Sequence, residues 1–244
     1  MKIYALIGQS LSHSFSEKYF TDKFREENIQ NTLYKNLEID NVSEIKEKII
    51  SHKILGFNVT IPHKSSIIPY LDFLDTDAEK IGSVNTVKVL NGNLYGFNTD
   101  VIGFEKSILP LIKRRRKSLI LGNGGVSKSI QFVLKRLNIK IKIVSRNSDL
   151  DYHNISEDLI KKSDIIINTT PLGTHPNINF YPEIPYKYLN SKHLLYDVVY
   201  NPELSQFLKF GKENGTQIKN GLEMLQTQAD QSWKIWNSDV NLNL

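Results

Sequence analysis

Short apolar runs alternate with amphipathic segments along most of this chain, and the alternation predicts an α/β protein. In the second half, the apolar runs read as strands and helical spacing fills the intervals. The strands predicted there are Leu119–Leu121, Ile139–Val144, Asp164–Asn168, Leu194–Tyr200 and Gln217–Lys219, with helices over Val101–Leu111 and Glu203–Asn214. Strands joined by helices favour a parallel sheet, which binds ligands beyond the carboxyl ends of its strands.

The first hundred residues repeat this alternation on a smaller scale and predict a separate α/β domain. Its predicted strands are Ile3–Ile7, Thr32–Leu37 and Gly56–Thr60, its helices are Ser16–Glu27 and Val42–Ile50, and a hairpin joins Val84–Leu90 to Leu94–Phe97. The segment contains no glycine-rich phosphate turn, so any dinucleotide site is expected in the second half.

Polar side chains stand at the ends of these predicted elements, outside any predicted apolar face, so core packing does not require them. They include Ser14, Ser16, Thr60, Lys64, Asn85 and Asp100. Each also has a structural interpretation. Lys64 reads equally well as an exposed charge at a helix start, Asp100 as the N-cap of the next helix, and Thr60 and Asn85 as partners of turn backbone.

A glycine-rich turn, Gly122-Asn123-Gly124-Gly125-Val126-Ser127, follows the strand Leu119–Leu121 and leads into a helical pattern. Strand, tight turn and helix in this order bring backbone N–H groups and a helix N-terminus against a pyrophosphate. Gly122 permits the sharp turn, Gly124 permits close approach of a ligand, and Ser127 is small enough for helix and strand to pack. A turn that binds nothing remains the alternative interpretation of this pattern.

The next predicted strand ends in Ser145-Arg146, where a dinucleotide fold contacts the adenosine ribose. An arginine there, in place of an acidic residue, suits a 2′-phosphate. The predicted cofactor is NADP(H) rather than NAD(H).

Composition sets limits without choosing a function. The chain has 244 residues, of which 40% are hydrophobic and 23% charged, and this is ordinary for a globular protein of one large or two modest domains. No apolar run is long enough to cross a bilayer, and the N-terminus is too short and strand-like for a signal peptide, so we expect a cytoplasmic protein without membrane partners. The absence of cysteine excludes disulfides, thiolate metal sites and cysteine nucleophiles.

A formal charge of +5 and the block Lys113–Lys117 raise the question of nucleic acid. The block lies between a predicted helix and a predicted strand, so a solvated inter-domain connection explains it, and no aromatic-rich sheet face or recognition helix accompanies it. We therefore expect no nucleic-acid partner. The six histidines are scattered without ligand spacing, so no metal site is expected, and His13 and His63 suit structural hydrogen bonds.

Eight short stretches carry the most specific signal. They are Leu11 to Ser16, Asn58 to Lys64, Ser83 to Thr86, Gly96 to Asp100, Gly122 to Ser127, Asn168 to Gly173, Asp197 to Pro202, and Gly221 to Leu225 with Gln228. In these stretches, and in their order along nearly the whole chain, the protein resembles the shikimate dehydrogenase family.

The resemblance implies reduction of 3-dehydroshikimate to shikimate with NADPH, a step of chorismate and aromatic amino-acid biosynthesis. It implies two α/β domains with a cleft between them, an N-terminal substrate domain completed by the C-terminal helices and a Rossmann-like domain that binds NADP. The expected boundaries are 1–100 with 222–244 for the substrate-binding and catalytic domain, and 101–221 for the NADP-binding domain. It leaves a homodimer open.

The resemblance also assigns residues. By likeness, shikimate would contact Ser14, Ser16, Thr60, Lys64, Asn85, Asp100, Tyr200 and Gln228, and the cofactor would contact Gly122, Asn123, Gly124, Gly125, Val126, Ser145, Arg146, Val198 and Gly221. Lys64 would stand at the reacting carbon with Asp100 beside it. Trp233 and Trp236 are expected to pack the last helix onto the substrate domain rather than to touch a ligand.

The chemistry suits these residue types. Reducing a ring ketone needs a proton for the developing alkoxide, and a positioned ammonium is a suitable acid whose neutral amine serves as base in reverse. A neighbouring carboxylate such as Asp100 would orient the ammonium and favour its charged form.

Two alternatives to this interpretation stay open. A quinate or dual quinate/shikimate dehydrogenase shares the Lys64 and Asp100 pair, although paired hydroxyls at Ser14 and Ser16 favour shikimate. A catalytically silent NADP-binding regulator is the other, and retention of both Lys64 and Asp100 argues against it. The chain also departs from the family pattern in having one cation, Arg146, where two are usual, and Asp149 would repel a 2′-phosphate if its side chain turned inward.

Overall fold

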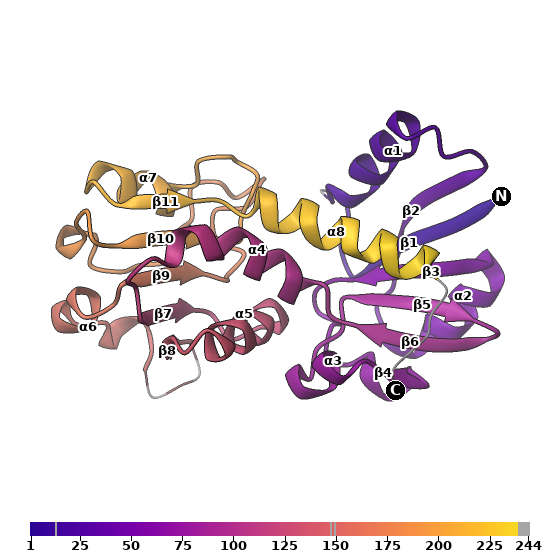
Figure 1. The fold of residues 1–244 in the computed structure, drawn as a ribbon, viewed down its shortest axis with the longest axis horizontal. Helices are drawn as coiled ribbons and strands as arrows, with labels where there is room; N and C mark the ends of the chain where they lie inside the picture. The colour runs from indigo at the N-terminus through magenta and orange to yellow at the C-terminus, as the bar shows by residue number, and fades with distance from the viewer. Residues whose placement is uncertain (13, 147, 149, 239–244) are drawn as a thin grey trace. The chain divides into compact units, whose positions relative to one another are not determined.

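The computed structural model describes residues 1–12, 14–146, 148 and 150–238. The chain divides into two compact units, each with its own sheet (Figure 1). Unit 1 comprises Met1–Thr99 and Gln228–Leu244, and unit 2 comprises Asp100–Thr227. The α/β prediction is confirmed in both units.

Unit 1 has a six-stranded mixed sheet in the order β2-β1-β3-β5-β6-β4. Strands β1, β2 and β3 run parallel, and β5 runs antiparallel to both of its neighbours. The elements are β1 (Lys2–Gly8), α1 (Ser16–Glu26), β2 (Thr32–Glu38), η1 (Val42–Glu44), α2 (Ile45–His52), β3 (Ile54–Val59), η2 (Ile68–Tyr70), β4 (Phe73–Leu74), α3 (Thr76–Ile81), β5 (Thr86–Leu90) and β6 (Asn93–Phe97).

The core of unit 1 lies on both faces of this sheet, as the alternation along β1 requires. Ala5 and Ile7 join one cluster with α2, while Tyr4 and Leu6 join another with α1 and the last helix, α8 (Leu222–Asn237). In the second cluster the Trp236 ring stacks on Tyr4 at 4.9 Å, and its indole N–H donates to a backbone carbonyl of β5 at 2.9 Å. The predicted packing role of the tryptophans is confirmed.

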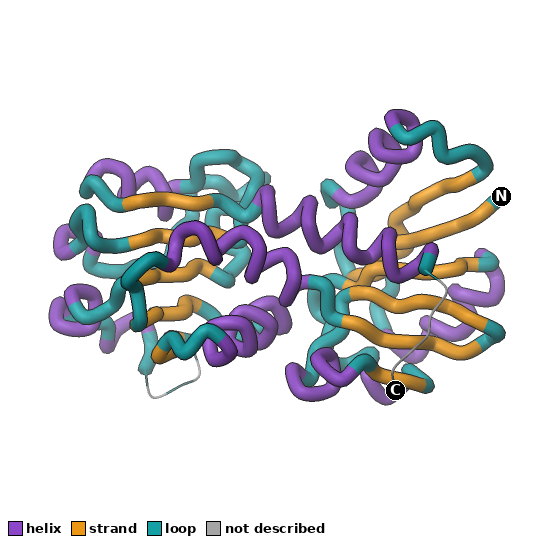
Figure 2. The backbone as a smooth tube through the Cα atoms, viewed as in Figure 1, coloured by secondary structure: helices purple, strands orange, loops and turns teal. Residues whose placement is uncertain are grey.

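Unit 2 has a five-stranded sheet in the order β11-β10-β9-β7-β8, and every pair in it is parallel, as predicted. The elements are α4 (Asp100–Ile112), β7 (Lys117–Leu121), α5 (Gly125–Arg136), β8 (Lys140–Val144), η3 (Tyr152–Asn154), α6 (Glu157–Lys161), β9 (Ile165–Asn168), η4 (Tyr186–Tyr188), β10 (Leu194–Asp197), α7 (Gln206–Glu213), β11 (Gln217–Lys219) and the start of α8. Figure 2 shows these strands alternating with helices along the chain. Because β8 and β9 flank β7 on opposite sides, the strand order reverses at β7, and ligands of such sheets bind there.

Some element boundaries differ from the prediction. Strand β10 ends at Asp197 rather than Tyr200, because the Asp197 carboxylate accepts a hydrogen bond from the N–H of Val199 at 3.0 Å and turns the chain. Helix α7 begins at Gln206 rather than near Glu203, since Ser205 caps it. The sequence pattern missed α3, α6 and β4, which span six, five and two residues and are too short to show a clear period.

The basic block Lys113–Lys117 joins α4 to β7 inside unit 2, so the prediction of an inter-domain connection was wrong, although most of it is solvent-exposed. Its arginines have a structural role. The guanidinium of Arg115 donates to the carbonyl of Leu111 at 2.6 Å, and that of Arg116 donates to the carbonyl of Lys113 at 3.2 Å. These bonds satisfy carbonyls at the C-terminal end of α4, where cations are favourable.

Among the described residues, no helix has both the length and the apolar composition needed to cross a bilayer.

Candidate functional site

The carboxyl ends of β1 and β3 in unit 1 bring two of the predicted substrate segments together. A Cβ on Gly8, the last residue of β1, would lie 2.5 Å from the Thr60 methyl and 2.8 Å from the Leu11 side chain. The N–H of Thr60 donates to the carbonyl of Ile7 at 2.9 Å. Glycine at position 8 therefore lets the serine-containing loop after β1 and the turn after β3 pack closely.

Ser14 and Ser16 stand at the entrance to α1. The N–H of Ser14 bonds to the carbonyl of Leu11 at 2.9 Å, and the hydroxyl of Ser14 accepts from the N–H of Ser16 at 3.2 Å. Burial raises the pKa of the Tyr34 phenol well above its ordinary value, and Ser16 opposes this shift to a smaller extent. Tyr34 is not among the predicted site residues, because it lies inside a strand pattern.

A buried hydrogen-bond network extends from Tyr34 to the other predicted substrate residues. The Tyr34 hydroxyl donates to Asn58 at 2.8 Å, and the Asn58 amide donates to the carbonyl of Asn85 at 3.1 Å and to Ser232 at 2.9 Å. The Asn85 amide in turn donates to Gln228 at 3.3 Å. The network ties Tyr34, Asn85 and Gln228 into one region of unit 1, and Asn85 is more than nine-tenths buried.

Lys64 lies four residues after Thr60 in a turn, so the alternative of a charge at a helix start was wrong. Its carbonyl accepts from the N–H of Val84 at 2.7 Å, which fixes its backbone beside Asn85, and its side chain is half-buried. The preceding residue, His63, is buried with its ring Nε2 3.1 Å from the carbonyl of Ile39, which confirms the predicted structural hydrogen bond. His13 lies outside the described residues.

Asp100 is the first residue of α4 and is only 4% exposed. The N–H of Thr99, which precedes it, donates to the side-chain oxygen of Asn85 at 2.7 Å. The Asp100 carboxylate is therefore shielded from bulk water, and Asn85 fixes the backbone of the residue before it.

The glycine-rich turn of unit 2 follows β7 at the point where the strand order reverses. Gly122 has φ +105°, and a Cβ there would lie 2.7 Å from the Thr169 hydroxyl oxygen, so both its backbone and its neighbours require glycine. The fully buried Ser127 donates from its hydroxyl to the carbonyl of Gly122 at 2.9 Å, which explains a small polar residue in this position.

The N-terminus of α5 is open to a ligand. Gly124 is its N-cap and provides no side-chain hydrogen bond, whereas α3, α6 and α7 are capped by Asp75, Ser156 and Ser205. A Cβ on Gly124 would meet no protein atom within 4 Å. The space above the turn and the uncapped first turn of α5, with no acidic residue in it, fit a pyrophosphate.

Ser145 and Arg146 follow β8 beside this turn, because the N–H of Gly122 donates to the carbonyl of Val144 at 2.8 Å. The hydroxyl of Ser145 donates to that of Ser148 at 3.1 Å and closes the loop. Arg146 is exposed, and its charge acts on Tyr152, whose pKa is raised by burial and lowered to a smaller extent by the arginine. Asn147 and Asp149, on which the predicted strength of NADP preference depends, lie outside the described residues.

A buried carboxylate organises the loop after β10. Asp197 accepts from Asn168 at 2.9 Å and from Ser205 at 2.5 Å, besides the N–H of Val199. Burial raises the pKa of Asp197 to about 7, although these hydrogen bonds oppose the shift. Asp197 is not among the predicted site residues, although a polar residue at the end of an apolar run is a signal that could have identified it.

The same loop carries Val198 and Tyr200. A Cβ on Gly221 would lie 2.1 Å from the carbonyl oxygen of Val198, so the two backbones touch and no larger residue fits without movement. Tyr200 is half-buried. Unit 2 therefore presents the glycine turn, the Ser145–Arg146 loop and the Val198 loop at the carboxyl edge of its sheet.

Comparison with known proteins identifies the family. Residues 6–87 match the family model described as the shikimate dehydrogenase substrate binding domain. A shikimate dehydrogenase (NADP(+)) of Clostridium beijerinckii is 39% identical over 97% of this chain and 92% of its own length. The chain belongs to the shikimate dehydrogenase family.

Solved structures of shikimate dehydrogenases share the fold. That of shikimate dehydrogenase 1 from Peptoclostridium difficile is 33% identical and matches with a TM-score of 0.87 over 99% of this chain and 94% of its own. A shikimate dehydrogenase in complex with NADP+ is 32% identical and matches with a TM-score of 0.85 over 97% and 90%.

Proposed function

We propose that this protein is an NADP-dependent shikimate dehydrogenase that reversibly reduces 3-dehydroshikimate to shikimate in chorismate and aromatic amino-acid biosynthesis. The observation that carries the proposal is the open glycine turn of Gly122 and Gly124 in a chain that matches an enzyme of this name over 97% of its length. A cytoplasmic location and a homodimer stay predictions.

The domain assignment follows the two half-sites. We assign residues 1–100 and 222–244 to substrate binding and catalysis, and residues 101–221 to NADP binding. Support comes from the network that joins Asn85 to Gln228 of α8, since it ties the C-terminal helix to the N-terminal sheet.

Bound NADPH supplies the hydride. The backbone of Gly122, Asn123, Gly124, Gly125 and Val126 would hold its pyrophosphate, Ser145 and Arg146 its adenosine ribose phosphate, and Val198 and Gly221 would contact it at the far end of the sheet edge. The uncapped first turn of α5 favours anionic phosphate oxygens through its N–H groups and its dipole.

Lys64 supplies the proton. Its ammonium would donate to the developing alkoxide during ketone reduction, and its neutral amine would accept the hydroxyl proton in the reverse direction. Asp100 would orient that ammonium and hold a ring hydroxyl. Lys64 is half-buried and Asp100 is buried, so each charge is partly removed from water and would act more strongly on a bound substrate.

The remaining side chains would recognise the rest of the substrate. Hydroxyls of Ser14, Ser16 and Tyr200 suit its carboxylate, and Thr60, Asn85 and Gln228 suit its hydroxyls. Because Asn85 and Gln228 are already fixed by the buried network, they would bind a hydroxyl with little loss of side-chain freedom.

One absorbance assay tests the proposal. Formation of reduced cofactor is followed with shikimate and with quinate, each with NADP+ and with NAD+. We expect the highest rate for shikimate with NADP+. Comparable rates on quinate would indicate dual specificity, and no turnover of either acid, despite NADP+ binding measured by calorimetry, would indicate a regulator and overturn the proposal.

A further inference from the structure

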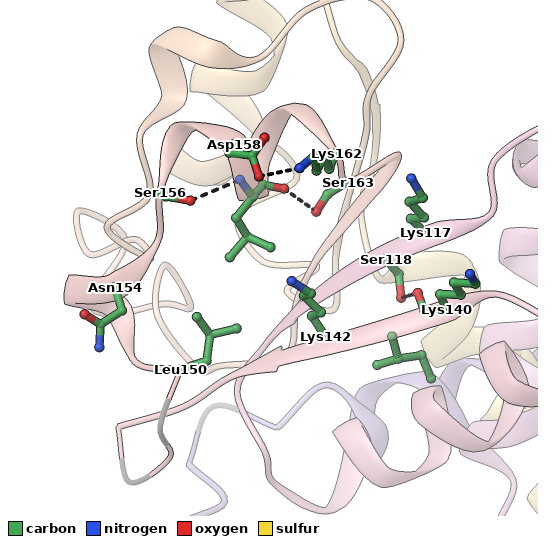
Figure 3. A pocket seen from close by; sticks show the side chains of 12 residues that line it. Lys117, Ser118, Lys140, Lys142, Leu150, Asn154, Ser156, Asp158, Lys162 and Ser163 are labelled. Atoms are coloured by element: carbon green, nitrogen blue, oxygen red, sulfur yellow. Dashed lines mark hydrogen bonds and ion pairs between the residues drawn. The ribbon is translucent and has the colours of Figure 1, made fainter.

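Unit 2 contains a pocket of about 510 Å³ between its outer strands and α6 (Figure 3). It runs from the first residues of β7 and β8 to Leu150, whose carbonyl accepts from the N–H of Ser145 in the loop after β8. Four of its lining residues are Lys117, Lys140, Lys142 and Lys162. Lys117 and Lys140 are the first residues of their strands, whereas the proposed cofactor contacts follow the last residues.

The register places three of these lysines on one face of the sheet. Lys117 is the direct partner of Lys140, and Lys142 is two residues further along β8. Val144, the next position on that face, is fully buried in the cluster that includes Leu159 of α6. The three lysines are exposed, so they continue this face of the sheet beyond its buried part, and like charges directly opposite each other are destabilising.

Two acids lie near these lysines. The pocket contains Asp158, whose carboxylate pairs with Lys162 at 2.7 Å, and the carboxylate of Asp164 accepts from the backbone N–H of Lys117 at 2.9 Å. Among the residues that the structure describes, none of the ion pairs includes Lys117, Lys140 or Lys142.

Protection of a sheet edge explains these lysines only in part. Strand β8 is the outer strand, and lysines on an outer strand discourage pairing with another chain. Lys117 is on β7, which pairs with β8 on one side and β9 on the other, so edge protection does not account for it.

We propose that this pocket binds a small organic polyanion, with phosphate oxygens between Lys117, Lys140 and Lys142. Leu150 (Figure 3) and Leu159 line the same space and would cover the apolar body of such a ligand. The volume falls within the range of small-molecule sites. Binding would remove the repulsion between the lysines, which is the physical reason for the affinity.

The test is calorimetric titration of the full chain with tripolyphosphate and with ATP at low salt, where charges are least screened. The titration is run with and without saturating NADP+, because NADP+ is itself an organic polyanion. Binding that persists with NADP+ lies outside the glycine turn, and binding that NADP+ displaces is assigned by the variants below. We expect saturable binding, tighter for ATP because of its base. The double variant Lys140→Ala/Lys142→Ala should bind about tenfold more weakly or worse, as expected for loss of charge-assisted bonds.

The matched control is Lys209→Ala/Lys212→Ala, which removes the same charge from exposed positions of α7 and should leave the affinity unchanged. If both double variants lost the same affinity, the effect would come from net charge alone, and the proposal would be overturned. So would the absence of saturable binding to the wild type, or self-association of Lys140→Ala/Lys142→Ala with unchanged affinity, which would assign the lysines to edge protection. Dehydrogenase activity does not enter the readout, so this proposal and the proposed function fail independently.

Discussion

The two units build their half-sites from different parts of the chain. Unit 1 presents side chains, and a network of buried polar groups that includes Tyr34, Asn58 and Ser232 orients them by hydrogen bonds. Unit 2 presents mainly backbone, shaped by Gly122, Gly124 and Gly221. A site of side chains is damaged by removing atoms, and a site of backbone is damaged by adding them.

This difference matches what each half-site has to recognise. A pyrophosphate is bound by several N–H groups at once, and a helix N-terminus provides them without side chains. A polyhydroxylated ring needs donors and acceptors in a particular order, which requires side chains whose orientation is fixed. Four predictions test the contrast, and we take them from the largest effect to the smallest.

Removing the amine of unit 1 should have the largest effect. Lys64→Ala should lower turnover by roughly 10²- to 10⁴-fold, the range for general acid–base groups, because no proton donor remains at the alkoxide. Steady-state kinetics measure the loss, and calorimetry should show NADPH binding unchanged. Lys80→Ala, an exposed lysine of α3, is the matched control. Full turnover in Lys64→Ala would remove Lys64 from the mechanism.

The buried carboxylate of unit 2 should control the pH dependence of stability. The unfolded chain ionises Asp197 above about pH 4, whereas its folded pKa is about 7. Between these values the folded protein binds more protons than the unfolded one, so this group lowers the free energy of unfolding as pH rises. The slope for one proton is at most about 1.4 kcal/mol per pH unit.

Asp197→Asn should remove that slope, because an amide does not titrate in this pH range. The variant should still fold, because its amide oxygen can accept from Val199 and Asn168 while its nitrogen donates to Ser205. Urea unfolding at pH 4.5, 6 and 7.5 measures the difference between variant and wild type, which should move in the variant's favour as pH rises. Asp158→Asn, at an exposed position, is the control. A constant difference across the three pH values would contradict the raised pKa.

The half-site of unit 2 was the part that residue patterns could predict. Apolar runs separated by helical spacing gave its parallel strands, and the glycine turn could be recognised because only glycine tolerates φ +105° beside Thr169. Errors occurred where side chains override the period. Asp197 ended β10 three residues early, and Ser205 delayed α7. These hydrogen bonds join residues only two or three positions apart, but the period of apolar residues does not report them.

The half-site of unit 1 could not be assembled from patterns alone. Asn85 and Gln228 stood out as polar residues or family matches, but what joins them is the buried network through Asn58 and Ser232, residues that are 174 positions apart. Periodicity reports only neighbours along one element. The resemblance to the family assigned these residues to one substrate site, but it did not give the hydrogen bonds that connect them.

Adding a single methyl group to unit 2 should separate folding from cofactor binding. Gly221→Ala would place its methyl carbon against the carbonyl oxygen of Val198, so we expect a loss of about 1–3 kcal/mol in the free energy of unfolding. Gly124→Ala has room for the methyl and a negative φ, so stability should be unchanged while NADPH affinity falls. Urea unfolding and cofactor titration distinguish the two variants. Unchanged NADPH affinity in Gly124→Ala would show that the ligand does not approach this turn.

The smallest predicted effect concerns Arg146, the charged side chain that unit 2 would contribute to the choice between NADPH and NADH. Arg146→Ala should weaken NADPH by roughly tenfold, as expected for one charge-assisted bond at an exposed site, and should leave NADH nearly unaffected because NADH lacks the 2′-phosphate. Titration of both cofactors at two salt concentrations measures this, and the NADPH difference should shrink at high salt. Arg114→Ala, an exposed arginine of the basic block, should change neither affinity. Equal weakening of NADPH and NADH would mean that Arg146 does not contact the phosphate, and recognition in unit 2 would then rest on backbone alone.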